Sequence, residues 1–161
     1  LVDNDALFDA LETGVVKRYI TDFGTEDLLN KPNVTVFPHV GGSTGEAELN
    51  CAIMAGQTIR RFMETGEIVN SVNFPRVQQA LSAPYRITLI NKNVPNIVAR
   101  ISTAVSDFNI NIDNIINRSK GDYAYTLLDL DESDKEKIDE LVAKFEASDN
   151  IVRVRLIKGK K

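Results

Sequence analysis

His39 is the only histidine in this chain of 161 residues, and its surroundings suit proton transfer. Imidazole accepts and releases protons near neutral pH, which is what general acid–base catalysis requires. A carboxylate on the far ring nitrogen would fix the tautomer and stabilise the imidazolium. Gly41 and Gly42 follow, and glycine lets backbone approach a flat ring closely. An isolated histidine is more often a surface or capping residue. On the residues alone, a role in proton transfer and a surface or capping role both stay open for His39.

Composition and charge exclude several classes of function. The net charge of -4 and the sequence pI near 5.1 argue against a nucleic-acid binder, which usually has a basic surface. The basic group Lys158, Lys160 and Lys161 is interpreted as a solvated end. No apolar run is long enough to span a bilayer. One cysteine and one histidine allow neither an internal disulfide nor a histidine cluster for a metal, so we expect a reducing cytoplasm and metal-free chemistry.

The first part of the chain predicts the trailing edge of an α/β sheet. Apolar spacing predicts a helix over 5–12 that Gly14 ends, then strands at 15–20 and 34–37 joined by a loop over 22–32. Ser43 and Glu46 have capping-box spacing, so a helix of about 20 residues should begin near Thr44 and end at Gly66. Cys51 falls inside this helix, where we expect a buried structural thiol.

The second part predicts a more regular fold. Residues 70–84 break the periodicity and form the expected boundary, which divides the chain into 1–70, a linker over 71–84, and a domain over 85–161. The periodicity then predicts a strand through 91, a helix over 97–108, strands at 112–118 and 123–131, a helix and a last strand. Ser133 and Glu136 have capping-box spacing before that helix. Val152, Val154 and Leu156 should face inward from the last strand. This βαββαβ order is that of a ferredoxin-like fold with an antiparallel sheet.

Four motifs in order resemble one enzyme family. The run 38–44 with Glu46 and Ala47 resembles the histidine signature of the D-2-hydroxyacid dehydrogenases, and the segments 1–3, 6–7, Gly14 and 20–26 resemble that family upstream. The run 70–75 resembles the linker that D-3-phosphoglycerate dehydrogenases place before a C-terminal regulatory domain. The βαββαβ unit resembles an ACT domain, with its ligand loop at 91–96. The resemblance implies the tail of a Rossmann-like dehydrogenase domain followed by an ACT domain.

The resemblance also implies roles for individual residues. His39 would be the catalytic base and Glu26 its carboxylate partner, while Asp22 and Gly41 would lie beside the nicotinamide of NAD. The implied reaction is oxidation of 3-phosphoglycerate to 3-phosphohydroxypyruvate, which opens L-serine biosynthesis.

The ACT resemblance implies a sensor. Its effector contacts match Asn91, Asn93 and Asn111, and asparagine offers the donors and acceptors that the groups of an amino acid need. The start of the helix near Asn96 would offer N–H groups to a carboxylate. L-serine or another small amino acid is the expected effector, and homodimers through this domain are the expected assembly. The same asparagines also suit turns and helix starts, which is the alternative.

Two absences limit what the chain should do by itself. It contains no G-x-G-x-x-G, so no pyrophosphate cradle is expected, and the family's substrate-binding arginine would lie upstream of Leu1. We therefore expect a chain without dehydrogenase activity of its own. Two other functions stay open, namely a non-catalytic amino-acid-binding and dimerisation module, and part of a dehydrogenase for another 2-hydroxyacid.

Overall fold

The computed structural model describes residues 2–159, which form two compact units that divide between Ile53 and Met54. Leu1 of the upstream motif and Lys160 and Lys161 of the basic end lie outside the described residues. The predicted boundaries at 70 and 85 fall within the second unit, and as a domain division they stay a prediction. No helix among residues 2–159 combines the length and apolar character that crossing a membrane requires.

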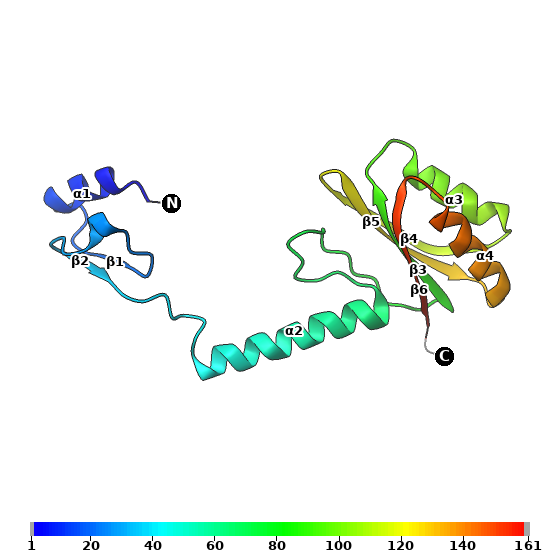
Figure 1. Cartoon of the computed structure of the whole chain (residues 1–161), viewed down its shortest axis with the longest axis horizontal. Helices are drawn as coiled ribbons and strands as arrows, with labels where there is room; N and C mark the ends of the chain where they lie inside the picture. The colour runs from blue at the N-terminus through cyan, green and yellow to red at the C-terminus, as the bar shows by residue number, and fades with distance from the viewer. Residues whose placement is uncertain (1, 160–161) are drawn as a thin grey trace. The chain divides into compact units, whose positions relative to one another are not determined.

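The first unit is built around a short parallel strand pair (Figure 1). Helix α1 (Asn4–Glu12) is capped by Asp3, whose side chain accepts from the Ala6 N–H. β1 (Tyr19–Thr21) and β2 (Val34–Val36) run parallel. The predicted strand at 15–20 is wrong before Tyr19, because the chain is still closing off α1 there: the Val16 N–H donates to the Ala10 carbonyl at 2.9 Å.

The core of this first unit is small. Among residues 2–53, only Leu7 of α1 and Leu28 of the 3-10 helix η1 (Glu26–Leu28) are buried hydrophobics. Asn4 ties the two elements by donating to Asp27 at 2.7 Å and to Thr25 at 3.3 Å. Hydrogen bonds from Thr25 and Asn4 lower the pKa of Asp27 below its ordinary value. So few buried side chains give this unit little apolar stabilisation of its own.

Helix α2 (Gly45–Thr65) has the predicted length and ends at Gly66, whose φ is +71°. Its cap differs from the prediction, since the hydroxyl of Thr44, not that of Ser43, accepts from the Ala47 N–H at 3.1 Å. No residue of α2 is buried. Cys51 is therefore exposed, and the expectation of a buried thiol is wrong because nothing among the described residues covers its face of the helix.

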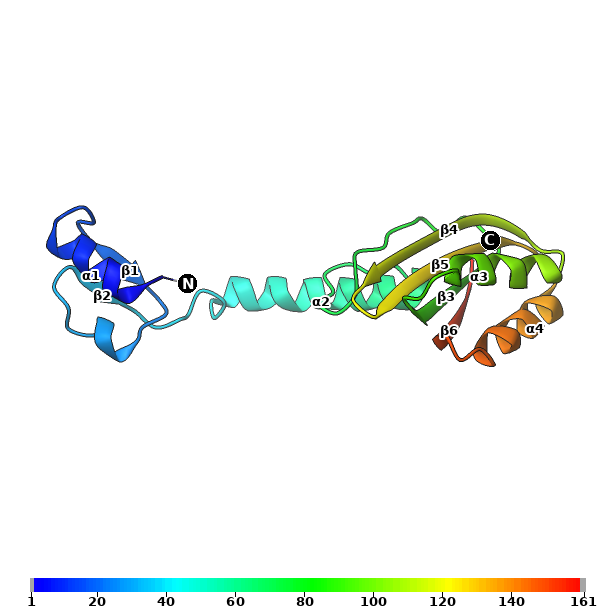
Figure 2. The same ribbon diagram turned by 90° about the horizontal axis from the view of Figure 1, so that it is seen from above.

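The second unit has the predicted βαββαβ order. Its elements are β3 (Tyr85–Lys92), α3 (Ile97–Asp107), β4 (Asn111–Lys120), β5 (Tyr123–Asp131), α4 (Lys135–Glu146) and β6 (Ile151–Lys158). The strands form one antiparallel sheet in the order β4-β5-β3-β6, and β4 is an edge strand (Figure 2). The predicted ferredoxin-like fold is confirmed.

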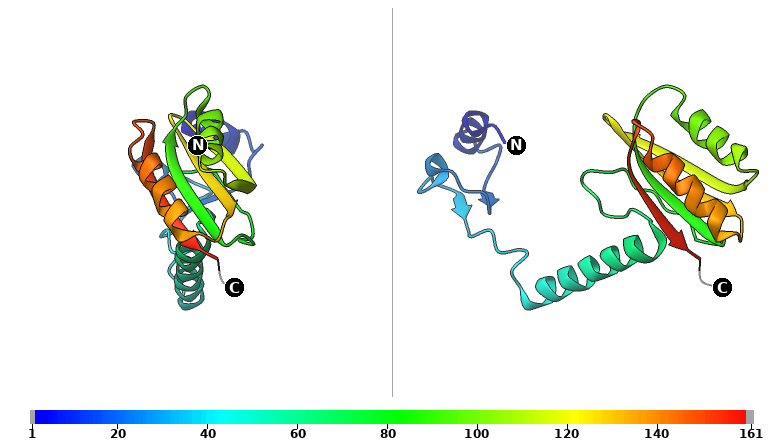
Figure 3. Two further views of the ribbon diagram at one scale, coloured as in Figure 1. Left: turned by 90° about the vertical axis from the view of Figure 1, so that its right-hand side faces the viewer. Right: turned by 45° about the vertical axis from the view of Figure 1, so that its right-hand side comes forward.

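The main core lies between the helices and the sheet. α3 and α4 lie side by side on one face, as the right-hand view of Figure 3 shows. Apolar side chains at helical spacing in α3 and α4 pack against the inward-facing side chains of the strands. The residues that are at most 1% exposed include Ile101, Val105, Ile138 and Leu141 of the helices and Ile87, Leu89, Leu128 and Leu130 of the strands. Burial on this scale, about 25 cal/mol per Å² of apolar surface, makes this layer the main source of stability of the unit.

The opposite face of the sheet is covered by Ile68 and by part of the segment 71–84 that was predicted as a linker. Ile68 and Val77 pair through two backbone hydrogen bonds of 2.8 and 3.0 Å and pack against Tyr125 and Leu127. Phe74 contacts the same cluster, with its ring centroid 6.1 Å from that of Tyr125. Much of the segment is therefore part of the folded unit.

The end of α2 is fixed to the same face by three side chains. Arg86 donates to the Thr65 carbonyl at 2.8 Å, Tyr125 donates to that of Gly66 at 2.7 Å, and Arg155 donates to those of Phe62 and Met63. The last carbonyls of a helix lack partners within it, so these donors cap its C-terminus.

Two local details differ from the prediction. The cap of α4 is Asp134, which accepts from the Glu136 N–H at 2.9 Å, and not Ser133. In β6 a register shift between Ile90 and Asn91 of the partner strand skips Val152. Val152 is 57% exposed, whereas Ile151, Val154 and Leu156 pack on the core. A bulge inserts one residue and breaks the alternation of faces.

Candidate functional site

His39 lies in a tight turn directly after β2. The Val40 N–H donates to the Pro38 carbonyl at 2.9 Å, and the Ser43 N–H donates to the Val40 carbonyl at 2.9 Å. Its Nδ1 lies 3.0 Å from Oδ2 of Asp22, with the His39 side chain 58% exposed. The Phe23 ring is tilted against the imidazole, with 4.4 Å between centroids.

The loop that carries Asp22 is held against β2. The Phe23 N–H donates to the Thr21 hydroxyl at 3.0 Å, and the Phe37 N–H donates to the Thr21 carbonyl at 3.0 Å. Gly24 leaves no room for a side chain, since a Cβ there would lie 2.4 Å from Cγ1 of Val36. These contacts place the carboxylate of Asp22 beside His39.

The other two predicted residues of this half do not touch the imidazole. Glu26 is exposed at the start of η1, and the carboxylate beside His39 is that of Asp22. Gly41 is exposed, and a Cβ added there would meet nothing within 4 Å. The open space at Gly41 leaves room for a planar group. The roles of Glu26 and Gly41 stay predictions.

The pair of His39 and Asp22 has the geometry of an oriented base. A carboxylate on Nδ1 leaves Nε2 as the atom that can accept a proton.

Asn91 of the predicted sensor lies at the end of β3 and is fully buried. Its Oδ1 accepts from the Thr126 hydroxyl at 2.8 Å, and its Nδ2 donates to the Lys92 carbonyl at 3.0 Å. Thr126 in turn accepts from Nδ2 of Asn117 at 2.7 Å. These hydrogen bonds link the edge strand β4 through β5 to β3.

Neither Thr126 nor Asn117 is predicted from residue type or motif, although the pattern of β5 carries a signal for Thr126. Thr126 stands in the alternating set that otherwise holds Ala124, Leu128 and Leu130, all of which are fully buried. A polar residue at an inward position needs a buried partner, and this expectation points to Thr126 before the structure is known.

Asn93 lies beside Asn91, at the turn between β4 and β5. Its Nδ2 donates to the Gly121 carbonyl at 3.0 Å, and its backbone N–H donates to the Asp122 carbonyl at 2.8 Å. Asn93 is exposed, so its side-chain oxygen can face a ligand.

Asn111 lies at the other end of the sheet. It pairs with Asp131, whereas Asn91 pairs with Ala124. These partners are seven residues apart along β5, roughly 23 Å at the rise of a strand. Within one chain the structure therefore brings Asn91 and Asn93 together and leaves Asn111 apart.

Several curated proteins similar to this chain are named D-3-phosphoglycerate dehydrogenase. A D-3-phosphoglycerate dehydrogenase 2 from Saccharomyces cerevisiae is 30% identical over 139 residues, which cover 83% of this chain and 29% of the relative. The Escherichia coli K12 D-3-phosphoglycerate dehydrogenase is 26% identical over 168 residues, which cover 98% of this chain and 41% of the relative. The chain is a homologue of the D-3-phosphoglycerate dehydrogenases. It spans less than half the length of these relatives, and it matches no protein-family profile.

Solved structures similar to the chain include regulatory domains. The ACT domain from a GTP pyrophosphokinase of Chlorobium tepidum is 18% identical with a TM-score of 0.42, covering 45% of this chain and 95% of that one. The regulatory subunit of an aspartate kinase from Thermus thermophilus is 23% identical with a TM-score of 0.36, covering 48% and 52%.

Proposed function

We propose that residues 85–158 form the sensor of a D-3-phosphoglycerate dehydrogenase and bind a small amino acid, L-serine first, between two copies of the chain. The observation that carries this proposal is the separation of Asn111 from Asn91 and Asn93 along β5. One small ligand cannot contact both ends of one sheet. Two chains can supply both ends.

The edge strand β4 provides the pairing that this requires. β4 pairs with β5 and with no other strand among residues 2–159, and an unpaired edge of ten residues is a template for another strand. If two copies pair antiparallel along β4, the start of each β4 meets the end of the other. Lys120 at that end pairs with Tyr123, which pairs with Lys92, so Asn111 of one copy lies near Asn93 of its partner.

The groups gathered there suit an amino acid. Asn93 and Asn111 offer amide donors and acceptors for an ammonium group and a hydroxyl. Asn96 has a φ of 65°, and its side chain makes no capping hydrogen bond to α3. The Ile97 N–H already donates to the Val94 carbonyl at 3.4 Å, so the N–H groups of Val98 and Ala99 are the ones left for a carboxylate. Asn91 contributes indirectly, because Thr126 links it to Asn117 of the edge strand.

We also propose a catalytic role for the first unit within a longer enzyme. NAD would take the hydride as 3-phosphoglycerate becomes 3-phosphohydroxypyruvate in L-serine biosynthesis. His39 would accept the hydroxyl proton on Nε2, and Asp22 would hold Nδ1. The open space at Gly41 leaves room for the nicotinamide end of the cofactor, while the sequence offers no glycine-rich cradle for its pyrophosphate. We therefore expect no NAD-dependent turnover of 3-phosphoglycerate by the 161-residue chain alone.

Calorimetry on the full chain tests the sensor. We expect saturable heat with L-serine or a similar small amino acid, and a dimer by ultracentrifugation. Asn93→Ala and Asn111→Ala should each weaken binding by about tenfold or more, the usual effect of losing a hydrogen bond to a charged group. Asn50→Ala, in the exposed part of α2, is the matched control. Heat that is absent for every small amino acid at millimolar concentration would contradict the proposal.

A further inference from the structure

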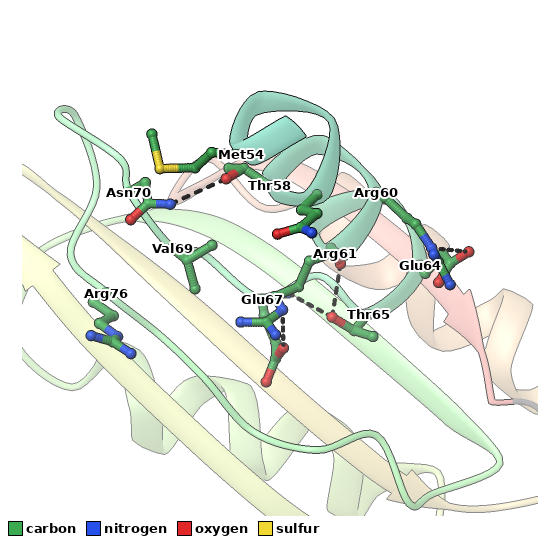
Figure 4. Close-up of a pocket in the computed structure, with 11 residues that line it drawn as sticks. Met54, Thr58, Arg60, Arg61, Glu64, Thr65, Glu67, Val69, Asn70 and Arg76 are labelled. Carbon is green, nitrogen blue, oxygen red and sulfur yellow. Dashed lines mark hydrogen bonds and ion pairs between the residues drawn. The ribbon is translucent and has the colours of Figure 1, made fainter. Parts of the chain in front are cut away.

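A cavity of about 690 Å³ lies between the second half of α2 and the segment that follows it. Figure 4 shows its lining, which is mostly polar. Its charged side chains are three arginines and two glutamates, namely Arg60, Arg61, Arg76, Glu64 and Glu67. The chain as a whole carries a net charge of -4, whereas the charged side chains of this lining have a surplus of positive charge.

Both glutamates are already engaged. Glu64 pairs with Arg60 one helical turn away at 3.3 Å, and both are well exposed. Glu67 has a side chain only 14% exposed, and its Oε1 accepts from the Gln79 N–H at 2.8 Å. Its carboxylate is fixed by the backbone and is not free to turn toward other cations.

Two arginines keep hydrogen-bonding capacity. Nε of Arg61 lies 3.6 Å from Glu67, which is an ion pair but longer than a hydrogen bond. Nε of Arg76 donates to Oε1 of Gln78 at 2.6 Å. The terminal nitrogens of both guanidinium groups have no hydrogen-bond partner among residues 2–159. Thr58 and Asn70, which bond to each other at 3.2 Å, add neutral polar groups to the wall.

We propose that this cavity binds a small dianion, a phosphate ester or a dicarboxylate, between Arg61 and Arg76. A guanidinium group presents paired N–H donors that match the oxygens of a carboxylate or phosphate. The cavity lies within the range of small-molecule sites, roughly 300–1,000 Å³, and its polar wall suits an ion more than an apolar ligand. The site belongs to α2 and the segment after it, and it is separate from the asparagines at the ends of the sheet.

Titration of the full chain with inorganic phosphate and with succinate tests this site. The two ions distinguish a phosphate group from a dicarboxylate as its ligand. We expect saturable binding of at least one of them that weakens as salt rises. Arg76→Gln should weaken it by about tenfold or more, as expected for a charge-assisted hydrogen bond. Arg76 is exposed and bonds only to Gln78, so this variant should fold normally.

Two further variants decide the outcome. Glu67→Gln keeps the acceptor for the Gln79 N–H but removes a negative charge from the wall, so it should tighten binding. Arg100→Gln, at an exposed position of α3, is the control and should leave affinity unchanged. No saturable binding of either ion, or an equal loss in Arg100→Gln and Arg76→Gln, would overturn the proposal.

Discussion

Arg86 is the most completely enclosed charge among residues 54–159, and its partners explain why it is tolerated. Its side chain is 0% exposed and pairs with Asp129, with Nε–Oδ1 at 2.5 Å and Nη2–Oδ2 at 2.7 Å. The remaining donors reach the carbonyls of Thr65, Gln79 and Ala80. A buried guanidinium needs such full pairing, because an unpaired charge in the interior is very costly.

Removing Arg86 should therefore destabilise the protein strongly. We expect Arg86→Met to lower the free energy of unfolding by about 3–5 kcal/mol, since Asp129 is left buried without its partner. Urea denaturation of the full chain measures this. The double variant Arg86→Met/Asp129→Leu should lose less than Arg86→Met, and an equal or larger loss would mean that the unpaired carboxylate is not the cause.

Tyr125 should make the free energy of unfolding depend on pH, in a direction that can be predicted. Burial raises the pKa of Tyr125 above its ordinary value of 10, so above pH 10 the unfolded chain releases this proton before the folded one. Its contribution to stability is complete below about pH 10 and is lost as the pH rises further. Tyr125→Phe should cost about 1 kcal/mol at pH 7 through the lost bond to Gly66. It should also show a smaller fall in unfolding free energy between pH 9 and pH 11, and an unchanged fall would contradict this.

At the scale of elements, two neighbouring residues, Ser133 and Asp134, are candidates for the N-terminal cap of α4. Asp134 accepts from the Glu136 N–H, whereas capping-box spacing pointed to Ser133. Asp134→Ala should cost about 1 kcal/mol of unfolding free energy, and Ser133→Ala should cost little. Urea denaturation of both variants measures the difference, and the reverse order would restore the capping-box interpretation.

The elements themselves could be predicted because apolar periodicity decides them. The spacing of Ile97, Ile101 and Val105 in α3, and of Ile138, Leu141 and Phe145 in α4, is the spacing that the core requires. Adjacent polar residues compete for one cap, and the backbone angles that choose between them are not visible in the sequence. The segment 71–84 lacks periodicity because it packs through Val77, Phe74 and backbone carbonyls and not through a regular face.

The candidate sites were predicted unevenly for the same reason. His39 and the asparagines could be proposed from residue type and motif. Asp22 is beside His39 because Gly24 packs the loop on β2. This packing cannot be predicted from a sequence motif. The burial of Asn91 depends on Thr126, which lies 35 residues away in sequence. Long-range partners of this kind require the fold.

At the scale of the molecule, no single copy of the chain should hold a complete sensor site. A complete site takes Asn93 from one chain and Asn111 from the other. Calorimetry on a mixture of Asn93→Ala and Asn111→Ala chains, unfolded and refolded together, tests this most directly. Each variant alone should bind L-serine weakly. Mixed dimers should regain one intact site each, so affinity like that of the unaltered chain should return at reduced stoichiometry. A mixture that binds no better than its components would contradict the shared site.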